Sequence, residues 1–450
     1  MKVVFVVGAG PAGLYAAQKI ARAGYEVVIF NRDIKPGGLA EYGIYPTKEK
    51  MKGGLRKQFA KILVLPQVSY FGHLPVGEGY ALHLDALREF NPAALVFSVG
   101  AQGTKELGLP GEHAKGVYSA KDYVFYYNQL PPFSSQDFSS GKRVAIVGMG
   151  NVAIDIAHWL LVDDPLHSAE EVTIVARRGP FEAKFDEKEF DYVEQHFDRR
   201  AFDEELQRVK EKVAAVGQDI TKLSETTFPV LAKPAQDAVK PLLKFRFLCS
   251  AKEVISGPNG RIEKLVVTEN LLVPKGDGTA AKATDQTATL DFDTMIFAIG
   301  DTADPKVGLP FSKDSYVTNP DLASGEHAAY EVFDPAAGKV VPGTFVVGWA
   351  RKASDGLVGV ARFDAEKGAI HVLQYLESAP EPKTATPEEI AKHIERSGRQ
   401  LVDKAGLELL GRVEAAQAQT LGVPSFKFSE DDKMLAAIAQ EKSAPVSADD

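Results

Sequence analysis

The chain has 450 residues, 45% hydrophobic and 25% charged, and this length predicts two to three domains. Its 61 acidic and 52 basic residues give a net charge of −9, which argues against a general nucleic-acid-binding protein. The apolar stretches are too short and too interrupted for a membrane span of about 20 residues, so we expect no membrane association. The single cysteine, Cys249, excludes an internal disulfide, a CxxC redox pair and a cysteine-held cluster within this chain. We expect a cytoplasmic protein whose redox chemistry comes from a bound cofactor.

The chain opens with the pattern strand, turn, helix, strand. Lys2–Val7 is a β-branched run, residues 8–13 form a glycine-rich turn, Leu14–Ala23 has helical spacing, and Glu26–Phe30 is a second strand. A GxGxxG turn between a strand and a helix is the fingerprint of a dinucleotide-binding unit.

Each residue of this turn has a mechanical role in that interpretation. Gly8 permits the tight turn, Gly10 lets the backbone approach a pyrophosphate, and Gly13 lets helix and strand pack closely. The acidic residue expected at the end of the second strand, where it would bind ribose hydroxyls, is Asn31. Its amide predicts a weaker contact, and Asp33, two residues later, is the alternative.

A similar unit recurs about 140 residues downstream, after a strand that ends within Leu95–Gly100. Arg143–Val147 predicts a strand, residues 148–153 a turn, Ile154–Val162 a helix and Glu171–Ala176 another strand. The sequence therefore predicts two nucleotide-binding domains.

The second unit ends its strand in arginines instead of an acid. Gly148 and Gly150 supply the turn, and Arg177-Arg178 suits a 2′-phosphate, which favours NADP while NAD stays possible. The alternative is two solvated arginines at a strand end. Asp155, on the following helix, either complements the helix dipole or faces the cofactor.

The remaining segments complete the order of elements. Thr294–Gly300 predicts a strand that returns the chain to the first domain, residues 181–240 read as mostly helical, and 245–295 as strands. After Pro380 the pattern is helical, and residues 443–450 read as a loose tail. The nine histidines show no ligand spacing, so we expect no metal site, and no hydrolase or P-loop motif occurs.

Several motifs together resemble the adrenodoxin-reductase type of ferredoxin–NADP reductase and the related flavoprotein subunit of glutamate synthase. The matching segments, in the family's order, are residues 7–13, Gly37-Gly38-Leu39, Tyr42-Gly43-Ile44, Leu109-Pro110-Gly111-Glu112, residues 150–155, Arg177-Arg178-Gly179-Pro180, Ala298-Ile299-Gly300-Asp301 and Val347-Gly348-Trp349. The resemblance implies an α/β, glutathione-reductase-like fold with two Rossmann-like domains and a C-terminal helical extension. In it, a split FAD domain (1–103 and 301–380) holds an inserted NAD(P) domain (104–300), and the extension covers 381–450.

The resemblance also implies which residues bind the cofactors. With the glycine turn, FAD would contact Pro11, Ala12, Asn31, Gly38, Leu39, Val76, Gly348, Trp349, Gly356, Leu357 and Val358. NADP would contact Gly148, Gly150, Asn151, Val152, Arg177, Arg178 and Glu189. Asp155, Lys48 and Trp349 are the candidate catalytic residues; Lys48 stands where the family has a histidine, and Ala353-Ser354 where it has a glycine–proline pair.

The implied activity is transfer of a hydride from NADPH to FAD and of single electrons to a ferredoxin-type iron–sulfur protein, or the reverse. The alternatives are the FAD/NAD(P) subunit of a larger hetero-oligomeric iron–sulfur oxidoreductase and a non-catalytic nucleotide sensor. Between Lys48 and Lys61 there are six basic residues and one acid, which predicts either a docking surface for an acidic iron–sulfur partner or a solvated helix face.

Overall fold

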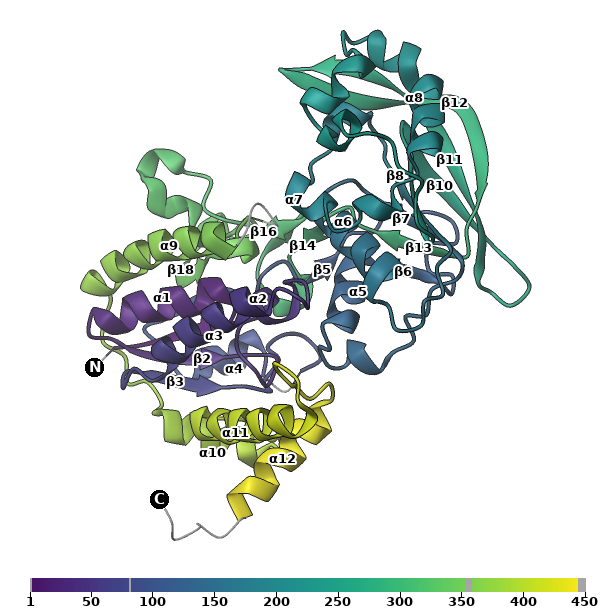
Figure 1. Cartoon of the computed structure of the whole chain (residues 1–450). Coiled ribbons are helices and arrows are strands. Elements are labelled where there is room, and N and C mark those ends of the chain that lie inside the picture. The colour runs from purple at the N-terminus through teal and green to yellow at the C-terminus, as the bar shows by residue number, and fades with distance from the viewer. Residues whose placement is uncertain (1, 81, 353–357, 444–450) are drawn as a thin grey trace. The chain divides into compact units, whose positions relative to one another are not determined.

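The computed structural model describes residues 2–80, 82–352 and 358–443 (Figure 1). The chain divides into two compact units. Unit 1 comprises Met1–Lys105, Phe125–Ser135 and Gly300–Asp450, and unit 2 comprises Glu106–Val124 and Gln136–Ile299.

Unit 1 is built on a six-stranded sheet in which the neighbouring strands are parallel except for the β17–β18 pair. In spatial order the strands are β17 (Glu331–Asp334), β18 (Lys339–Val346), β4 (Ala94–Phe97), β1 (Val3–Val7), β2 (Glu26–Phe30) and β3 (Val68–Phe71). Parallel strands need crossover connections, which α1 (Pro11–Arg22) provides between β1 and β2, and α3 (Glu49–Leu63) between β2 and β3.

Both faces of this sheet are covered, as the alternation of its side chains requires. Val4 and Val6 belong to a core with α1, α3 and α9 (Val358–Ser378), whereas Phe5 belongs to a core with α4 (Leu84–Glu89) and α10 (Pro387–Arg396). Figure 1 shows α1 and α9 side by side. The shorter elements of unit 1 are α2 (Leu39–Tyr42), β5 (Gly103–Thr104), β14 (Asp301–Thr302), β15 (Phe311–Ser312) and β16 (Ser315–Tyr316).

Unit 2 contains a five-stranded parallel sheet and a three-stranded antiparallel sheet. The parallel sheet runs β6 (Val117–Ser119), β13 (Thr294–Phe297), β7 (Arg143–Val147), β8 (Glu171–Val175), β9 (Leu242–Arg246). The antiparallel sheet comprises β10 (Cys249–Ser256), β11 (Ile262–Lys275) and β12 (Gly278–Asp291). The helices are α6 (Asn151–His158), α7 (Glu187–Phe190) and α8 (Arg199–Ala214), and α5 (Ala120–Tyr127) begins in unit 2 and ends in unit 1. Residues 181–240 are mostly helical, as predicted, but α8 is the one long helix among them and the other helical segments are short.

The predicted α/β architecture with parallel sheets and a C-terminal helical region is confirmed, and two boundaries differ from the prediction. Residues 125–135 group with unit 1, because Phe125 and Leu130 pack with Tyr42 in one small apolar cluster. The C-terminal region also groups with unit 1 instead of standing apart, because Ile390 and Ile394 of α10 lie in the core beneath the sheet. The predicted loose tail falls mainly on residues 444–450, outside the described residues.

Local sequence explains where the C-terminal helices begin. Thr386 accepts a hydrogen bond from the Glu389 amide, and the Glu389 carboxylate accepts one from the Thr386 amide, which closes a capping box ahead of α10. The Asp403 side chain caps α11 (Lys404–Leu421) by accepting a hydrogen bond from the Gly406 amide, and α12 (Asp431–Ser443) follows.

The segment between α11 and α12 inserts a lysine beside α2. The Lys427 ammonium lies 3.5 Å from the Glu41 carboxylate and 4.7 Å from the centre of the Tyr42 ring. Burial lowers the pKa of Lys427 to about 7, although Glu41 opposes the shift. Burial alone would raise the pKa of Glu41, but hydrogen bonds from Arg56 and the charges of Lys35 and Lys427 lower it to about 2. The C-terminal region is thus fastened to α2 by a buried charge cluster.

Replacement of this lysine by methionine is expected to flatten the pH dependence of stability. The pKa of Lys427 is about 7 in the folded chain and about 10.4 in the unfolded chain. The unfolded state therefore binds the extra proton in this window, so the lysine makes the free energy of unfolding rise with pH. Lys427→Met should reduce that slope by up to about 1.4 kcal/mol per pH unit.

Denaturant unfolding between pH 7 and 10 measures the slope. Lys392→Met removes an exposed lysine on α10 and should leave the slope as in the wild type. Equal slopes for Lys427→Met and the wild type would contradict the prediction.

Candidate functional site

A pocket opens in unit 1 around the carboxyl ends of β1, β2 and β4, and it encloses about 1140 Å³, its open mouth included. This is where open parallel sheets bind their ligands. The predicted cofactor-binding residues that line it are Gly8, Gly10, Pro11, Ala12, Asn31, Gly38, Leu39, Val76, Trp349 and Val358. The structure therefore brings together residues that are spread over 350 positions of the sequence.

The first glycine turn has the geometry that an approaching phosphate needs. Gly8 has φ +102°, and a Cβ there would come within 2.7 Å of the Ser98 carbonyl oxygen. A Cβ on Gly10 would instead enter open space, with no described atom within 4 Å. Gly10 begins α1 without a side-chain cap, and the first turn carries no acidic residue. The amide groups of this helix end can therefore take an anionic group.

Two predicted glycines serve packing and do not line the pocket. A Cβ on Gly13 would lie 1.9 Å from the Gly8 carbonyl oxygen, so only glycine allows α1 to approach the turn this closely. Gly348 has φ +64°, and a Cβ there would meet the Ala12 Cβ at 2.5 Å.

Asn31 lines the pocket, but its amide is used differently from the prediction. Its Oδ1 accepts from the Ala9 amide at 2.9 Å, and its Nδ2 donates to the carbonyl oxygens of Asp33 (2.8 Å) and Lys35 (3.1 Å) and to the Tyr70 hydroxyl (3.2 Å). The side chain is 6% exposed. Because these bonds occupy the amide, Asn31 braces the glycine turn instead of offering a free group to a ribose.

The predicted residue Trp349 is held by a polar clamp from α9. The Asp364 carboxylate accepts a 2.6 Å hydrogen bond from the Gly348 amide and forms an ion pair with Arg351. The Arg351 guanidinium also lies 4.4 Å from the centre of the Tyr330 ring. The Trp349 Nε1 is buried and has no hydrogen-bond partner among the described residues. A buried donor without an acceptor is costly, and a bound cofactor with ring or carbonyl acceptors would satisfy it. The open cradle at Gly10 and this donor together fit a dinucleotide with an aromatic head.

The basic segment 48–61 presents fewer charges than the sequence suggests. Lys52 is 3% exposed and donates to Asn128 at 2.8 Å, and Arg56 pairs with Glu41 and Glu49. Burial lowers the pKa of Lys52 to about 8. Lys50, Lys57 and Lys61 are exposed on α3, while Lys48 is half-buried at its N-cap. Of the six basic residues, Lys52 is therefore buried, and Arg56 is paired with two carboxylates although its side chain is 37% exposed, so these two add less positive charge to the surface than the others.

Unit 2 repeats the glycine turn at the carboxyl end of β7. Gly148 has φ +132°, with a Cβ position 2.2 Å from the Ala298 carbonyl oxygen, and a Cβ on Gly150 would meet no described atom within 4 Å. Asn151 exchanges two hydrogen bonds with Asp186, at 2.8 and 2.9 Å. Gly150 begins α6 without a side-chain cap, so this turn can also receive a phosphate.

The other predicted site residues of unit 2 lie on α6, on α7 and beyond β8. Val152 is exposed on α6, Asp155 is half-buried on α6 and Glu189 is half-buried on α7. Beyond β8, Arg177 is exposed and Arg178 half-buried. Of the candidate catalytic residues, Asp155 lies in unit 2, whereas Lys48 and Trp349 lie in unit 1, and only Trp349 lines the pocket. Gly356 and Leu357, with Ala353 and Ser354, lie outside the described residues.

Sequence reasoning missed much of the pocket wall. The unpredicted lining residues include Arg32, Leu74, Pro75, Tyr80, Ser98, Val99, Gly100, Gln102, Asp304, Val307 and Ala361. One signal could have found Ser98 and its neighbours, because they directly follow a buried strand and so stand at the carboxyl edge of the sheet. The others come from loops without a motif.

Neither a membrane-spanning helix nor a metal-binding cluster of side chains occurs in the described part of the chain. No helix within residues 2–80, 82–352 and 358–443 is long and apolar enough to cross a membrane. Over the same residues, no three histidine, cysteine, aspartate or glutamate side chains gather where they could hold a metal ion. Cys249 is buried, and burial raises the pKa of its thiol.

Known proteins are similar to this chain over nearly its whole length. The chain is 29% identical to NADPH-ferredoxin reductase FprA of Mycobacterium tuberculosis over 96% of this chain and 98% of the relative. It is 26% identical to the mitochondrial NADPH:adrenodoxin oxidoreductase of Arabidopsis thaliana, over 97% and 95% of the two chains. The structure of M. tuberculosis FprA in complex with NADPH is similar with a TM-score of 0.80, at 26% identity over 97% of this chain and 99% of the other.

These relatives confirm the family resemblance predicted from the motifs. In addition, a sequence profile described as pyridine nucleotide-disulphide oxidoreductase matches residues 2–334. With one cysteine in the sequence, a dithiol pair within this chain is excluded, so the match concerns the nucleotide-binding fold and its redox class. The chain therefore belongs to the pyridine nucleotide-disulphide oxidoreductase family.

Proposed function

We propose that the chain is an FAD-dependent oxidoreductase that exchanges electrons between NADPH and a ferredoxin-type iron–sulfur protein. The observation that carries the proposal is the pocket of unit 1, where an uncapped helix end, an open cradle at Gly10 and the Trp349 Nε1, which has no partner among the described residues, converge. The relatives named NADPH-ferredoxin reductase and NADPH:adrenodoxin oxidoreductase support it. A flavin bound there would supply the chemistry that links a two-electron donor to a one-electron acceptor.

The chain's own residues account for binding and orientation in this proposal. In unit 1 the turn at Gly8 and Gly10 would hold the FAD pyrophosphate, and the Asp364 clamp would fix Trp349 beside the cofactor. In unit 2 the turn at Gly148 and Gly150 would hold the NADP pyrophosphate. With its single cysteine the chain cannot hold an all-cysteine cluster, so the electrons leave for an acceptor elsewhere. One buried thiol also suits a reducing compartment, and we propose a cytoplasmic location.

Filling the cradle of Gly10 tests the FAD site. Gly10 has φ −72°, which alanine adopts readily, and the added methyl would touch no described atom. Gly10→Ala should therefore keep the fold, measured by circular dichroism, and lower FAD affinity about tenfold or more, because the methyl blocks close approach of the pyrophosphate.

The unmodified protein should bind FAD, show a flavin spectrum and lose it on anaerobic addition of NADPH. The control is Gly53→Ala, at an open position on α3, which should bind FAD normally. A colourless protein that fails to take up FAD, or a flavin that NADPH does not reduce, would refute the proposed function.

The choice of NADPH over NADH should depend on the two arginines beyond β8. Arg177→Ala/Arg178→Ala is expected to raise KM for NADPH by about tenfold to a hundredfold, because each arginine offers charge-assisted hydrogen bonds to a 2′-phosphate. KM for NADH should change little. Arg200→Ala, which removes an exposed arginine of α8, is the control. Unaltered constants for both coenzymes would disprove the 2′-phosphate assignment.

The exposed lysines of α3 are the proposed docking surface for the iron–sulfur partner. Lys50, Lys57 and Lys61 follow each other at spacings of seven and four, so they share one face of the helix. Lys50→Glu/Lys57→Glu should lower the second-order rate of electron transfer to an acidic ferredoxin by about tenfold at low salt, and the difference should shrink as salt is added.

Lys392→Glu/Lys442→Glu makes the same charge change on the C-terminal helices and serves as the control. Stopped-flow mixing across ionic strengths gives the rates. If the rate and its salt slope stay unchanged in the α3 variant, the docking surface lies elsewhere.

The second candidate function is that of a subunit in a permanent hetero-oligomeric complex. The exposed apolar residues Val360, Phe363 and Ile370 of α9 favour it. Purification from the source as a larger assembly with iron–sulfur subunits would favour that candidate.

A further inference from the structure

The backbone beyond β8 is held at three consecutive carbonyl groups by residues 248–249 and by Asn270 of β11. The Ala176 carbonyl oxygen accepts from the Cys249 amide at 2.9 Å, that of Arg177 from the Asn270 Nδ2 at 2.8 Å, and that of Arg178 from the Leu248 amide at 3.1 Å. The backbone that carries the two arginines is therefore fixed, while Arg177 is exposed and Arg178 half-buried.

Asn270 is the residue that joins these segments. It is 1% exposed, its amide N–H donates to the Leu248 carbonyl at 2.7 Å, and its Nδ2 also donates to the Ser250 hydroxyl at 2.8 Å. Leu248 itself has φ +53°, a strained value for a bulky residue that persists only where the surroundings enforce it. Asn270 is thus bonded to Leu248, Ser250 and Arg177 at once.

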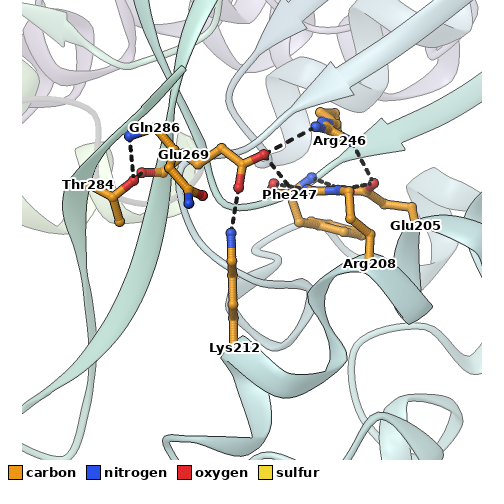
Figure 2. Close-up of polar contacts among 8 residues, drawn as sticks. All are labelled: Glu205, Arg208, Lys212, Arg246, Phe247, Glu269, Thr284 and Gln286. Atoms are coloured by element: carbon orange, nitrogen blue, oxygen red, sulfur yellow. Dashed lines mark hydrogen bonds and ion pairs between the residues drawn. The ribbon is translucent and has the colours of Figure 1, made fainter. Parts of the chain in front are cut away.

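Glu269, the residue before Asn270, belongs to a charge network (Figure 2). The Glu269 carboxylate accepts from Lys212 of α8 at 2.6 Å and lies 3.7 Å from both Arg208 and Arg246. Figure 2 shows Glu205 bridging the same two arginines, with the Phe247 amide donating to it at 2.7 Å. The network therefore fastens α8 and the end of β9 to β11.

The strand β12 is irregular at this place. Thr268 of β11 pairs with Thr287 of β12, but Asn270, two residues later, pairs with Ala283, four residues away from Thr287. Within this bulge the Thr284 hydroxyl donates to the Glu269 carbonyl oxygen at 2.8 Å. Bulges next to binding sites commonly re-aim a side chain. Here the bulge lies opposite Glu269, beside the asparagine that holds the Arg177 backbone.

The geometry points to Asn270 as a positioning residue that sets the preference for a coenzyme with a 2′-phosphate. It acts through the Arg177 carbonyl and does not contact the coenzyme. Because the arginine side chains are long and partly exposed, a fixed backbone lowers the entropy lost when they bind a phosphate. The inference rests on the proposed function, in which Arg177 and Arg178 bind that phosphate.

The test compares two ligands that differ in one phosphate. Binding of 2′,5′-ADP and of 5′-AMP to the FAD-loaded protein is measured by calorimetry. Asn270→Ala should weaken 2′,5′-ADP at least fivefold and leave 5′-AMP within twofold, because 5′-AMP does not need the arginines. Ser250→Ala, which removes the other partner of the Nδ2, is the matched control and should bind both ligands as the wild type does.

A second variant covers the case in which Asn270→Ala does not fold. Asn270→Ser keeps a hydroxyl at the buried position but is too short to reach the Arg177 carbonyl, and it should show the same selective loss. An unchanged ratio of the two affinities in the folded Asn270 variant, or an equal loss for both ligands, would overturn the inference.

Arg177→Ala, measured in parallel, separates this outcome from failure of the proposed function. If Arg177→Ala reduces 2′,5′-ADP binding while Asn270→Ser does not, the coenzyme assignment stands and the positioning role is wrong. If neither changes the ratio, the 2′-phosphate assignment itself is wrong.

Discussion

The close contact between Gly8 and Gly13 is the constraint on which unit 1 depends. A Cβ on Gly13 would lie 1.9 Å from the Gly8 carbonyl oxygen and 2.4 Å from the Ser98 Oγ. That hydroxyl donates to the carbonyl oxygens of Val7 and Gly8, at 3.0 and 2.8 Å, and so ties the end of β4 to the turn. The start of α1 is thereby held at the carboxyl edge of the sheet, where its amide groups are open to an anion. The pocket, the cradle at Gly10 and the close approach of Gly348 to Ala12 all lie around this helix start.

The sequence was sufficient for the parts of the fold that local rules determine. The β-branched runs predicted β2 and β7 with their observed bounds, and the glycine turns placed both helix starts within a few residues. It was insufficient where a side chain's environment comes from distant segments. Lys52 looks like a surface lysine in its own helix, yet it is buried and donates to Asn128, which is distant in the sequence. Net charge in a segment therefore overestimates the charge that a partner meets.

In the pocket, too, the residues that belong to a sequence motif were found, and those whose role depends on distant segments were not. Gly8 and Gly10 were found because glycine at fixed spacing has a steric reason, whereas Gly38 came from the family resemblance. Asn31 was found at the right place, but its four hydrogen bonds were not predicted, because they depend on a loop and on Tyr70, for which the sequence has no motif. Asp364 was not found at all, because its role arises only when α9 packs beside the Gly348 turn.

The hydrogen bonds of Asn31 explain why an amide replaces an acid at the end of β2 in unit 1. A carboxylate has only acceptors, so at position 31 it could take the Ala9 amide but would face the carbonyl oxygens of Asp33 and Lys35 without a donor. An asparagine satisfies both demands at once. In unit 2 the strand end is braced instead from β11, by Asn270 on the Arg177 carbonyl. Because that brace comes from another strand, the strand-end residues keep their own side chains for charge, and two arginines can stand where unit 1 uses a neutral amide.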